Sequence, residues 1–145
     1  MKRLICLLTL LLTLNAGICS AANWQWIYSD DYYGLYFDSD SLYFKYGGGR
    51  LPCITWVKWQ YTGASQGKFA VPQNTDFSLM KVQISPEGYI PLEEYFYDDD
   101  DNVLYYGNYA NYFNQPLTPI KDSLADKMVR AIANYTGTTK QLKLD

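Results

Sequence analysis

The stretch RLPCITWVKWQY, residues 50–61, decides the fold of this 145-residue chain. Side chains alternate between the two faces of a strand, so Ile54, Trp56 and Lys58 share one face. The other face carries Cys53, Thr55, Val57, Trp59 and Tyr61. Both faces are apolar at the centre, which predicts an interior strand with Trp56 or Val57 as a core anchor. Pro52 is expected at the start of the strand, where a missing N–H is tolerated.

Further short strands are predicted on both sides of this one. Alternating apolar residues bounded by turn residues indicate strands at 24–28, 34–38, 42–46, 77–84, 89–97 and 103–106. The last three are joined by Pro86-Glu87-Gly88 and by the acidic residues 98–102, which are turn signals, so we expect a meander of antiparallel neighbours. Residues 62–76 are mostly polar and predict an exposed loop.

One helix is predicted near the C-terminus. Ser123 is a candidate N-cap, Asp126 follows it at the capping-box spacing, and Gly137 supplies the stop. Apolar residues recur at helical spacing between these signals: Leu124, Met128, Ala131, Ile132 and Tyr135. The fold class is therefore α+β, a single antiparallel β-sheet of about six strands with a C-terminal α-helix packed on one face. The tail, residues 138–145, is expected to fray or to form a short edge segment.

The N-terminus has the pattern of a secretory signal peptide. Lys2 and Arg3 precede the apolar residues 4–14, and Ser20, Ala21 and Ala22 are small. Cleavage after Ala21 or, as we favour, after Ala22 leaves residues 23–145 as a single α+β domain. The predicted location is extracytoplasmic: periplasm, cell surface or secreted.

The alternative to simple cleavage is a lipid anchor on Cys19. A lipid-processing site requires a small residue where Ile18 stands, so we favour a mature chain that keeps only Cys53. That cysteine is expected to be a small buried hydrophobe, with a disulfide to another chain as the alternative.

Composition excludes several classes of function. The net charge of −3 becomes more acidic once Lys2 and Arg3 are removed, which argues against a nucleic-acid partner. No apolar run approaches the roughly 20 residues of a transmembrane helix. The chain has no His, which excludes Ser–His, Cys–His and His-based metal chemistry.

The acidic residues do not restore an enzyme site. Glu93 and Glu94 are adjacent on a predicted strand and therefore point to opposite faces. Residues 98–102 have the alternate spacing of a calcium loop, but Val103 and Tyr109 stand where that loop needs Gly and Glu. We therefore expect no enzymatic activity, no metal and no cofactor, with a weak calcium site at the acidic turn as the alternative.

Aromatic residues carry the candidate site. The chain has 15 Tyr, and the segment 105–114 mixes aromatic rings with Gly and Asn. Rigid aromatic anchors among adaptable amides are typical of binding loops. The candidate binding residues are Tyr105, Tyr106, Tyr109, Tyr112 and Phe113. The alternative is that some of these rings fold back and cap an open edge of the sheet.

The order of motifs resembles that of the surface-adhesin E family of bacterial exported proteins. The motifs are a Trp-containing first strand, YFDSDSL at 36–42, Trp56-Val57-Lys58, Tyr95 and Tyr97 before the acidic turn, and Pro119 and Ser123 before the helix. The resemblance implies a compact antiparallel sheet with a C-terminal helix packed against it. It also implies binding to extracellular matrix proteins such as vitronectin and laminin, and to plasminogen, by a homodimer at the cell surface.

The sequence thus predicts an exported, non-enzymatic binding protein of the bacterial envelope that engages a protein ligand through exposed aromatics. The alternatives are a periplasmic structural or inhibitor-type protein that binds an envelope enzyme, and a small carbohydrate-binding domain. The position of the 105–113 rings, exposed on one patch, buried, or lining a groove, distinguishes them.

Overall fold

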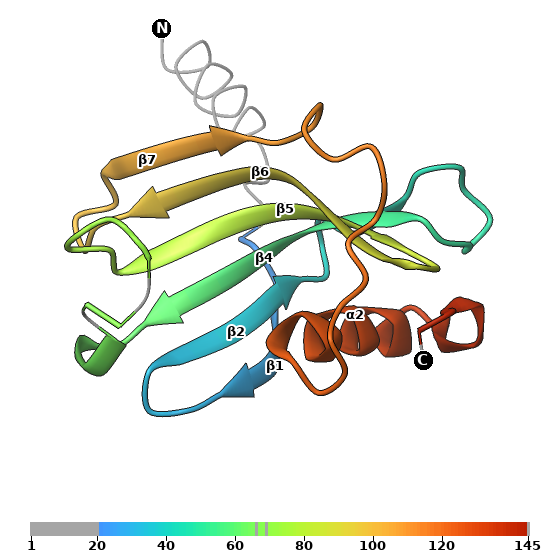
Figure 1. Cartoon of the computed structure of the whole chain (residues 1–145), viewed down its shortest axis with the longest axis horizontal. Helices are drawn as coiled ribbons and strands as arrows, with labels where there is room; N and C mark the ends of the chain where they lie inside the picture. Colours follow the sequence, from blue (N-terminus) through green and yellow to red (C-terminus); the bar gives the residue numbers. More distant parts are fainter. Residues whose placement is uncertain (1–20, 66, 69, 145) are drawn as a thin grey trace, which may run out of the picture.

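A computed structural model describes residues 21–65, 67–68 and 70–144, which form one antiparallel sheet with one α-helix against it (Figure 1). The helix is α2 (Leu124–Tyr135), and two short 3-10 helices are η1 (Gly63–Ser65) and η2 (Thr139–Gln141). The strands are β1 (Trp24–Ser29), β2 (Tyr33–Asp38), β3 (Tyr43–Phe44), β4 (Cys53–Tyr61), β5 (Phe77–Ser85), β6 (Gly88–Tyr97) and β7 (Val103–Asn108). The predicted α+β class is confirmed.

The strand order β1-β2-β4-β5-β6-β7 confirms two predictions. β4 lies between β2 and β5, as its two apolar faces indicate, and β5, β6 and β7 are consecutive antiparallel neighbours. β3 also pairs with β4, through Phe44 and Cys53. It lies along the same edge of β4 as β2, but β3 pairs with the start of β4 and β2 with its second half.

Side chains fill the gap between β2 and β3 along this edge of β4. The backbone N–H of Trp56 donates to Ser41 Oγ at 3.2 Å, in place of a strand partner. The hydroxyl of Thr55 donates to the carbonyl oxygen of Asp38 at 2.7 Å. The chain turns at this polar junction, so the strand predicted over 42–46 is shorter than expected and covers only Tyr43–Phe44.

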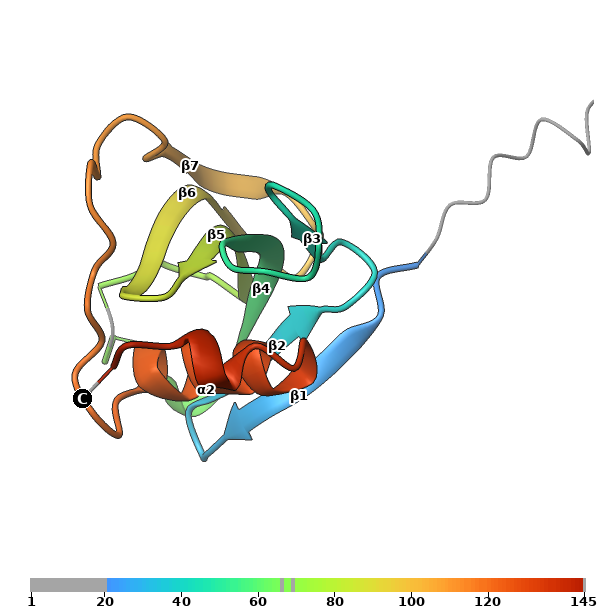
Figure 2. The ribbon, with the colours of Figure 1, turned by 90° about the vertical axis from the view of Figure 1, so that its right-hand side faces the viewer.

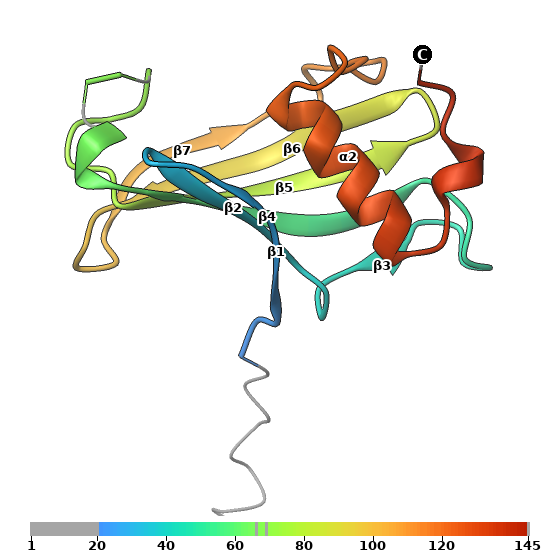
Figure 3. The same cartoon turned by 90° about the horizontal axis from the view of Figure 1, so that it is seen from below.

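The core lies between the sheet and α2, on a face that we call the helix-side face. The sheet curves around the helix (Figure 2), and no other described element covers the opposite face, which we call the open face (Figure 3). The core comprises Leu35, Phe37, Cys53, Val57, Val82, Ile84, Met128, Val129 and Ile132. Val57 is the predicted anchor, whereas Trp56 lies half-buried on the open face.

Cys53 is buried in this core and makes no disulfide. Burial raises the pKa of its thiol to about 11, so little reactive thiolate exists at neutral pH. The expected role as a small buried hydrophobe agrees with this position.

The ends of α2 follow the predicted signals. Ser123 Oγ accepts the N–H of Asp126 at 3.2 Å, and the Asp126 carboxylate accepts the N–H of Asp122 and pairs with Arg130 at 2.7 Å. Gly137 follows the helix with φ of 71°, a conformation that glycine adopts without strain.

The C-terminal tail departs from its prediction. It forms η2, and Leu142 and Leu144 then pack against the core. The Gln141 side chain accepts the backbone N–H of Leu51 at 2.9 Å, and the N–H of Lys143 donates to Pro86 at 2.8 Å. Because the two leucines bury apolar surface beside α2, the tail is neither frayed nor a short edge segment of the sheet.

Residues 109–123 connect β7 to α2 across the helix-side face, and we call them the crossing segment (Figure 2). The N–H of Tyr109 donates to Leu92 at 2.8 Å, and Tyr89 and Leu117 exchange two backbone hydrogen bonds of 3.1 and 2.8 Å. Gly88 has φ of 145°, and a Cβ there would collide with the carbonyl oxygen of Leu117. The crossing segment therefore lies directly against the turn between β5 and β6.

The predicted signal peptide, residues 1–22, lies outside the described residues except for Ala21 and Ala22. Within the described ranges, no helix has the length and apolar character needed to span a bilayer.

Candidate functional site

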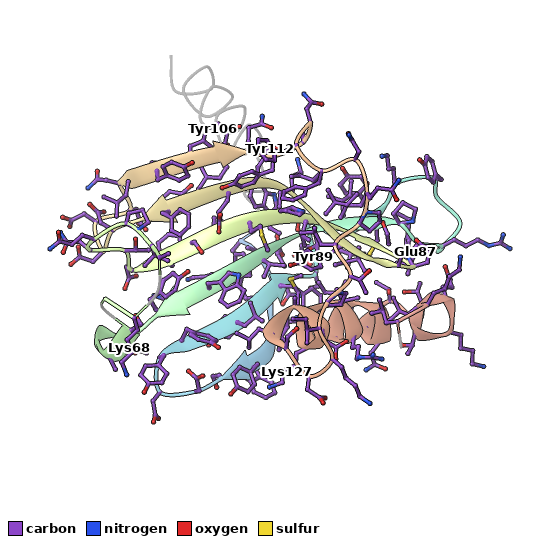
Figure 4. The ribbon with its side chains drawn as sticks, viewed as in Figure 1. Lys68, Glu87, Tyr89, Tyr106, Tyr112 and Lys127 are labelled. Atoms are coloured by element: carbon purple, nitrogen blue, oxygen red, sulfur yellow. The ribbon has the colours of Figure 1, made fainter. Side chains whose placement is uncertain are left out.

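The structure places the five candidate aromatic residues on different surfaces. Tyr105 and Tyr106 belong to β7, a strand that extends past the expected Tyr106 to Asn108, and they point to opposite faces of the sheet. Tyr109 and Phe113 lie in the crossing segment on the helix side, and Tyr112 beside them is 81% exposed. Tyr106 and Tyr112 both lie at the β7 edge in Figure 4. The five rings therefore contribute to two surfaces, one on each face.

The open face carries a connected row of aromatic side chains. Tyr95 is central: its ring centroid lies 6.0 Å from Trp56, 6.3 Å from Tyr97 and 4.6 Å from Tyr106. Tyr97 stacks on Phe77 at 4.7 Å with an interplanar angle of 11°. The row crosses β4, β5, β6 and β7 because residues opposite each other on neighbouring strands share a face.

Lysines lie among these rings. Lys58 Nζ is 4.7 Å from the centroid of Phe77, and Lys81 Nζ is 5.6 Å from that of Trp56 and 3.5 Å from the Glu93 carboxylate. The acidic turn 98–101 directly follows β6 at Tyr97. Asp98 accepts the backbone N–H groups of Asp100 and Asn102, and a hydrogen bond from the Asn102 side chain lowers the pKa of Asp98. The open face thus combines aromatic rings with two lysines and ends at an acidic turn.

A cavity of about 430 Å³ lies on the helix-side face, between the sheet and the crossing segment. Its sheet side is formed by Trp59, Met80, Glu94 and Phe96, which neighbouring strands place on the same face. The rest of the described lining comes from the crossing segment, from the ends of β4 and β6 and from the loop before β5: Tyr109, Phe113, Leu117, Tyr61, Tyr89, Pro91, Ala70 and Val71. Tyr89 lies between the sheet and α2 in Figure 4. The cavity is therefore largely aromatic and contains one carboxyl group.

Glu94 is the ionisable group that distinguishes this cavity. Burial raises the pKa of its carboxyl, and a hydrogen bond from the Tyr109 hydroxyl opposes that shift. Gly107, opposite Glu94 on β7, leaves room for the Tyr109 ring, since a Cβ there would lie 2.6 Å from the Tyr109 hydroxyl. The pKa of Tyr109 is raised in turn, mainly by burial and then by the charge of Glu94.

Sequence reasoning predicted that Glu93 and Glu94 point apart, and the structure confirms it. It missed the functional potential of Glu94, because nothing in the strand pattern shows that the crossing segment folds over it. It also missed the row around Tyr95 on the open face. A signal for that row was present, since the strand at 50–61 has two apolar faces and the single predicted helix could cover only one of them.

In the described ranges, no three His, Cys, Asp or Glu side chains are grouped to hold a metal ion. The cavity lining offers aromatic surface, tyrosine hydroxyls and one carboxylate. Comparisons with protein-family models, with curated proteins and with solved structures find no match.

Proposed function

We propose that this protein is an exported, non-enzymatic binding protein of the bacterial envelope that engages a protein ligand through the aromatic row of the open face. The supporting observation is that this row spans four strands and that no described element covers it. Tyr and Trp provide large contact area with few rotatable bonds, and they are enriched in protein-binding surfaces.

The resemblance to the surface-adhesin E family gives the proposal its ligand class. On that basis the ligand is an extracellular matrix protein or plasminogen, and the protein acts at the cell surface as a homodimer. The N-terminal pattern of residues 1–22 supports an extracytoplasmic location. Of the five residues predicted from the sequence, Tyr106 belongs to the proposed surface, next to Tyr95.

The test is binding of the protein, expressed from Met1 and purified from the extracytoplasmic fraction, to immobilised vitronectin, laminin and plasminogen. A double variant, Tyr95→Ser with Tyr106→Ser, removes the centre of the aromatic row. Truncating residues at the centre of an interface costs about 2 kcal/mol or more, so we expect the affinity to fall about 30-fold or more.

The matched control is Tyr46→Ser with Tyr112→Ser, which removes two tyrosines that are more exposed, at 78% and 81%, but do not belong to the aromatic row. This control keeps wild-type binding if the open face is the site. Thermal midpoints show that both variants are folded. Loss of binding in the control alone, or binding to none of the three proteins, contradicts the proposal. Capture of an envelope enzyme or a glycan instead favours the alternatives.

A further inference from the structure

We propose that the cavity beneath the crossing segment binds an organic cation, an ammonium group carried on a small apolar body. This site lies on the helix-side face, opposite the surface proposed for protein binding, so either proposal can fail without the other.

The shape of the cavity fits a small ligand. Its volume of about 430 Å³ is within the range of about 300–1,000 Å³ found for ligand pockets. Trp59, Phe96 and Phe113 provide apolar and aromatic walls from three separate segments of the chain. Phe113 and Glu94 are each half-buried, so a ligand can reach the carboxyl group from solvent.

The charge of the cavity selects a cation. Glu94 is the one acidic residue among the described lining residues, and Lys and Arg are absent from that lining. The ion pairs of the described chain are Lys81–Glu93, Arg130–Asp126 and Lys143–Glu87, so none of them neutralises Glu94. A bound ammonium would pair with the carboxylate and lie against aromatic faces, which attract cations.

The desolvation of Glu94 also favours a cationic ligand. Burial raises the pKa of Glu94, which means that the interactions inside the protein do not offset the cost of removing the ionised carboxylate from water. A bound ammonium ligand would stabilise the ionised carboxylate. An anion would instead meet the carboxylate in an apolar cavity, and a saccharide would need several polar partners where the walls are mostly carbon.

The experiment measures binding of three probes of similar size by calorimetry at neutral pH. The probes are 2-phenylethylammonium, the neutral 2-phenylethanol and the anionic 3-phenylpropanoate. We expect the ammonium to bind about tenfold or more tightly than the alcohol, and the anion to bind more weakly still. Equal affinity for the ammonium and the alcohol, or no binding of the ammonium, overturns the proposal.

Two adjacent substitutions locate the site. Glu94→Gln keeps the shape of the side chain and should erase the preference for the ammonium over the alcohol. Glu93→Gln removes the same charge from the open face and should leave that preference unchanged. Thermal midpoints establish that both variants are folded. If Glu94→Gln retains the preference, or if Glu93→Gln loses it, the cation does not bind at Glu94.

The same chemistry could be presented by a free amine or by a lysine side chain of a peptide. A fourth probe, the blocked peptide acetyl-Gly-Lys-Gly-amide, and its form acetylated on the lysine Nζ separate these sources. Binding of the unacetylated peptide that is tighter than that of the free amine assigns the ligand to a protein. Binding of the free amine alone assigns it to a small molecule.

Discussion

At the scale of single residues, two neighbouring glutamates have different environments because a strand alternates its side chains. Glu93 lies on the open face and pairs with Lys81 at 3.5 Å. Glu94 lies on the helix-side face, beneath Tyr109, where burial raises the pKa of its carboxyl. Sequence alone places the two on opposite faces, but only the folded chain shows which of them is desolvated.

This difference predicts a pH-dependent stability. Because the pKa of Glu94 is higher in the folded than in the unfolded chain, its contribution to the free energy of unfolding is fully present at pH values below the pKa in the unfolded chain. That contribution is lost as the pH rises through the pKa in the folded chain. From about pH 4.5, the ordinary value for Glu, upward, wild-type protein should lose stability relative to Glu94→Gln.

Urea unfolding at a series of pH values measures this effect, with Glu93→Gln as the matched control on the open face. The difference between wild type and Glu94→Gln should widen with pH and then level off. Parallel curves for these two proteins would show that Glu94 is not desolvated in the folded state.

At the scale of elements, the crossing segment depends on a close approach at the turn between β5 and β6. Gly88 combines φ of 145° with a position where a Cβ would collide with Leu117. Gly88→Ala should therefore cost more than the roughly 1–3 kcal/mol that is typical of a strained backbone conformation alone.

The control for backbone strain is Gly47→Ala, since Gly47 has φ of 71° but, apart from its chain neighbours, no atom within 4 Å of the place that a Cβ would occupy. Thermal or urea unfolding compares the two variants. Gly88→Ala should be clearly the less stable. Equal losses of stability would mean that the crossing segment does not rest on Gly88 in solution.

The elements with a regular period were predictable from sequence. The alternation in residues 50–61 predicts an interior strand, that in residues 77–84 predicts a strand of the meander, and Ser123, Asp126 and Gly137 predict the ends of α2. The crossing segment has neither period, so its path over the sheet, and with it the cavity, could not be predicted. The tail has no regular period either, so the packing of its two leucines against the core could not be predicted from the sequence.

Polar contacts between distant residues also escaped prediction. The strand expected at 42–46 is shortened because Ser41 and Asp38 bond to β4 across the junction with β2. Side-chain hydrogen bonds of this kind depend on which residues meet in space, and strand periodicity carries no such information.

At the scale of the whole molecule, export is the first prediction to check. The chain expressed from Met1 should lose residues 1–22 and appear in a soluble extracytoplasmic fraction, because a basic start, an apolar run and small residues have the pattern of a cleavable signal. Intact-mass measurement reads the outcome directly. Retention of residues 1–22, or a lipid on Cys19, contradicts it.

The sheet as a whole has one face buried under α2 and one face with an aromatic row that no described element covers. The proposed function rests on the claim that the uncovered face binds the protein ligand. Hydroxyl-radical footprinting with mass spectrometry is the direct test, because it reports the solvent exposure of individual side chains with and without the ligand. The oxidation of Trp56, Tyr95 and Tyr106 should slow in the complex, while Tyr46 and Tyr112 keep their rates. Protection confined to Tyr112 and the crossing segment, with open-face residues oxidised as in the free protein, would contradict the claim.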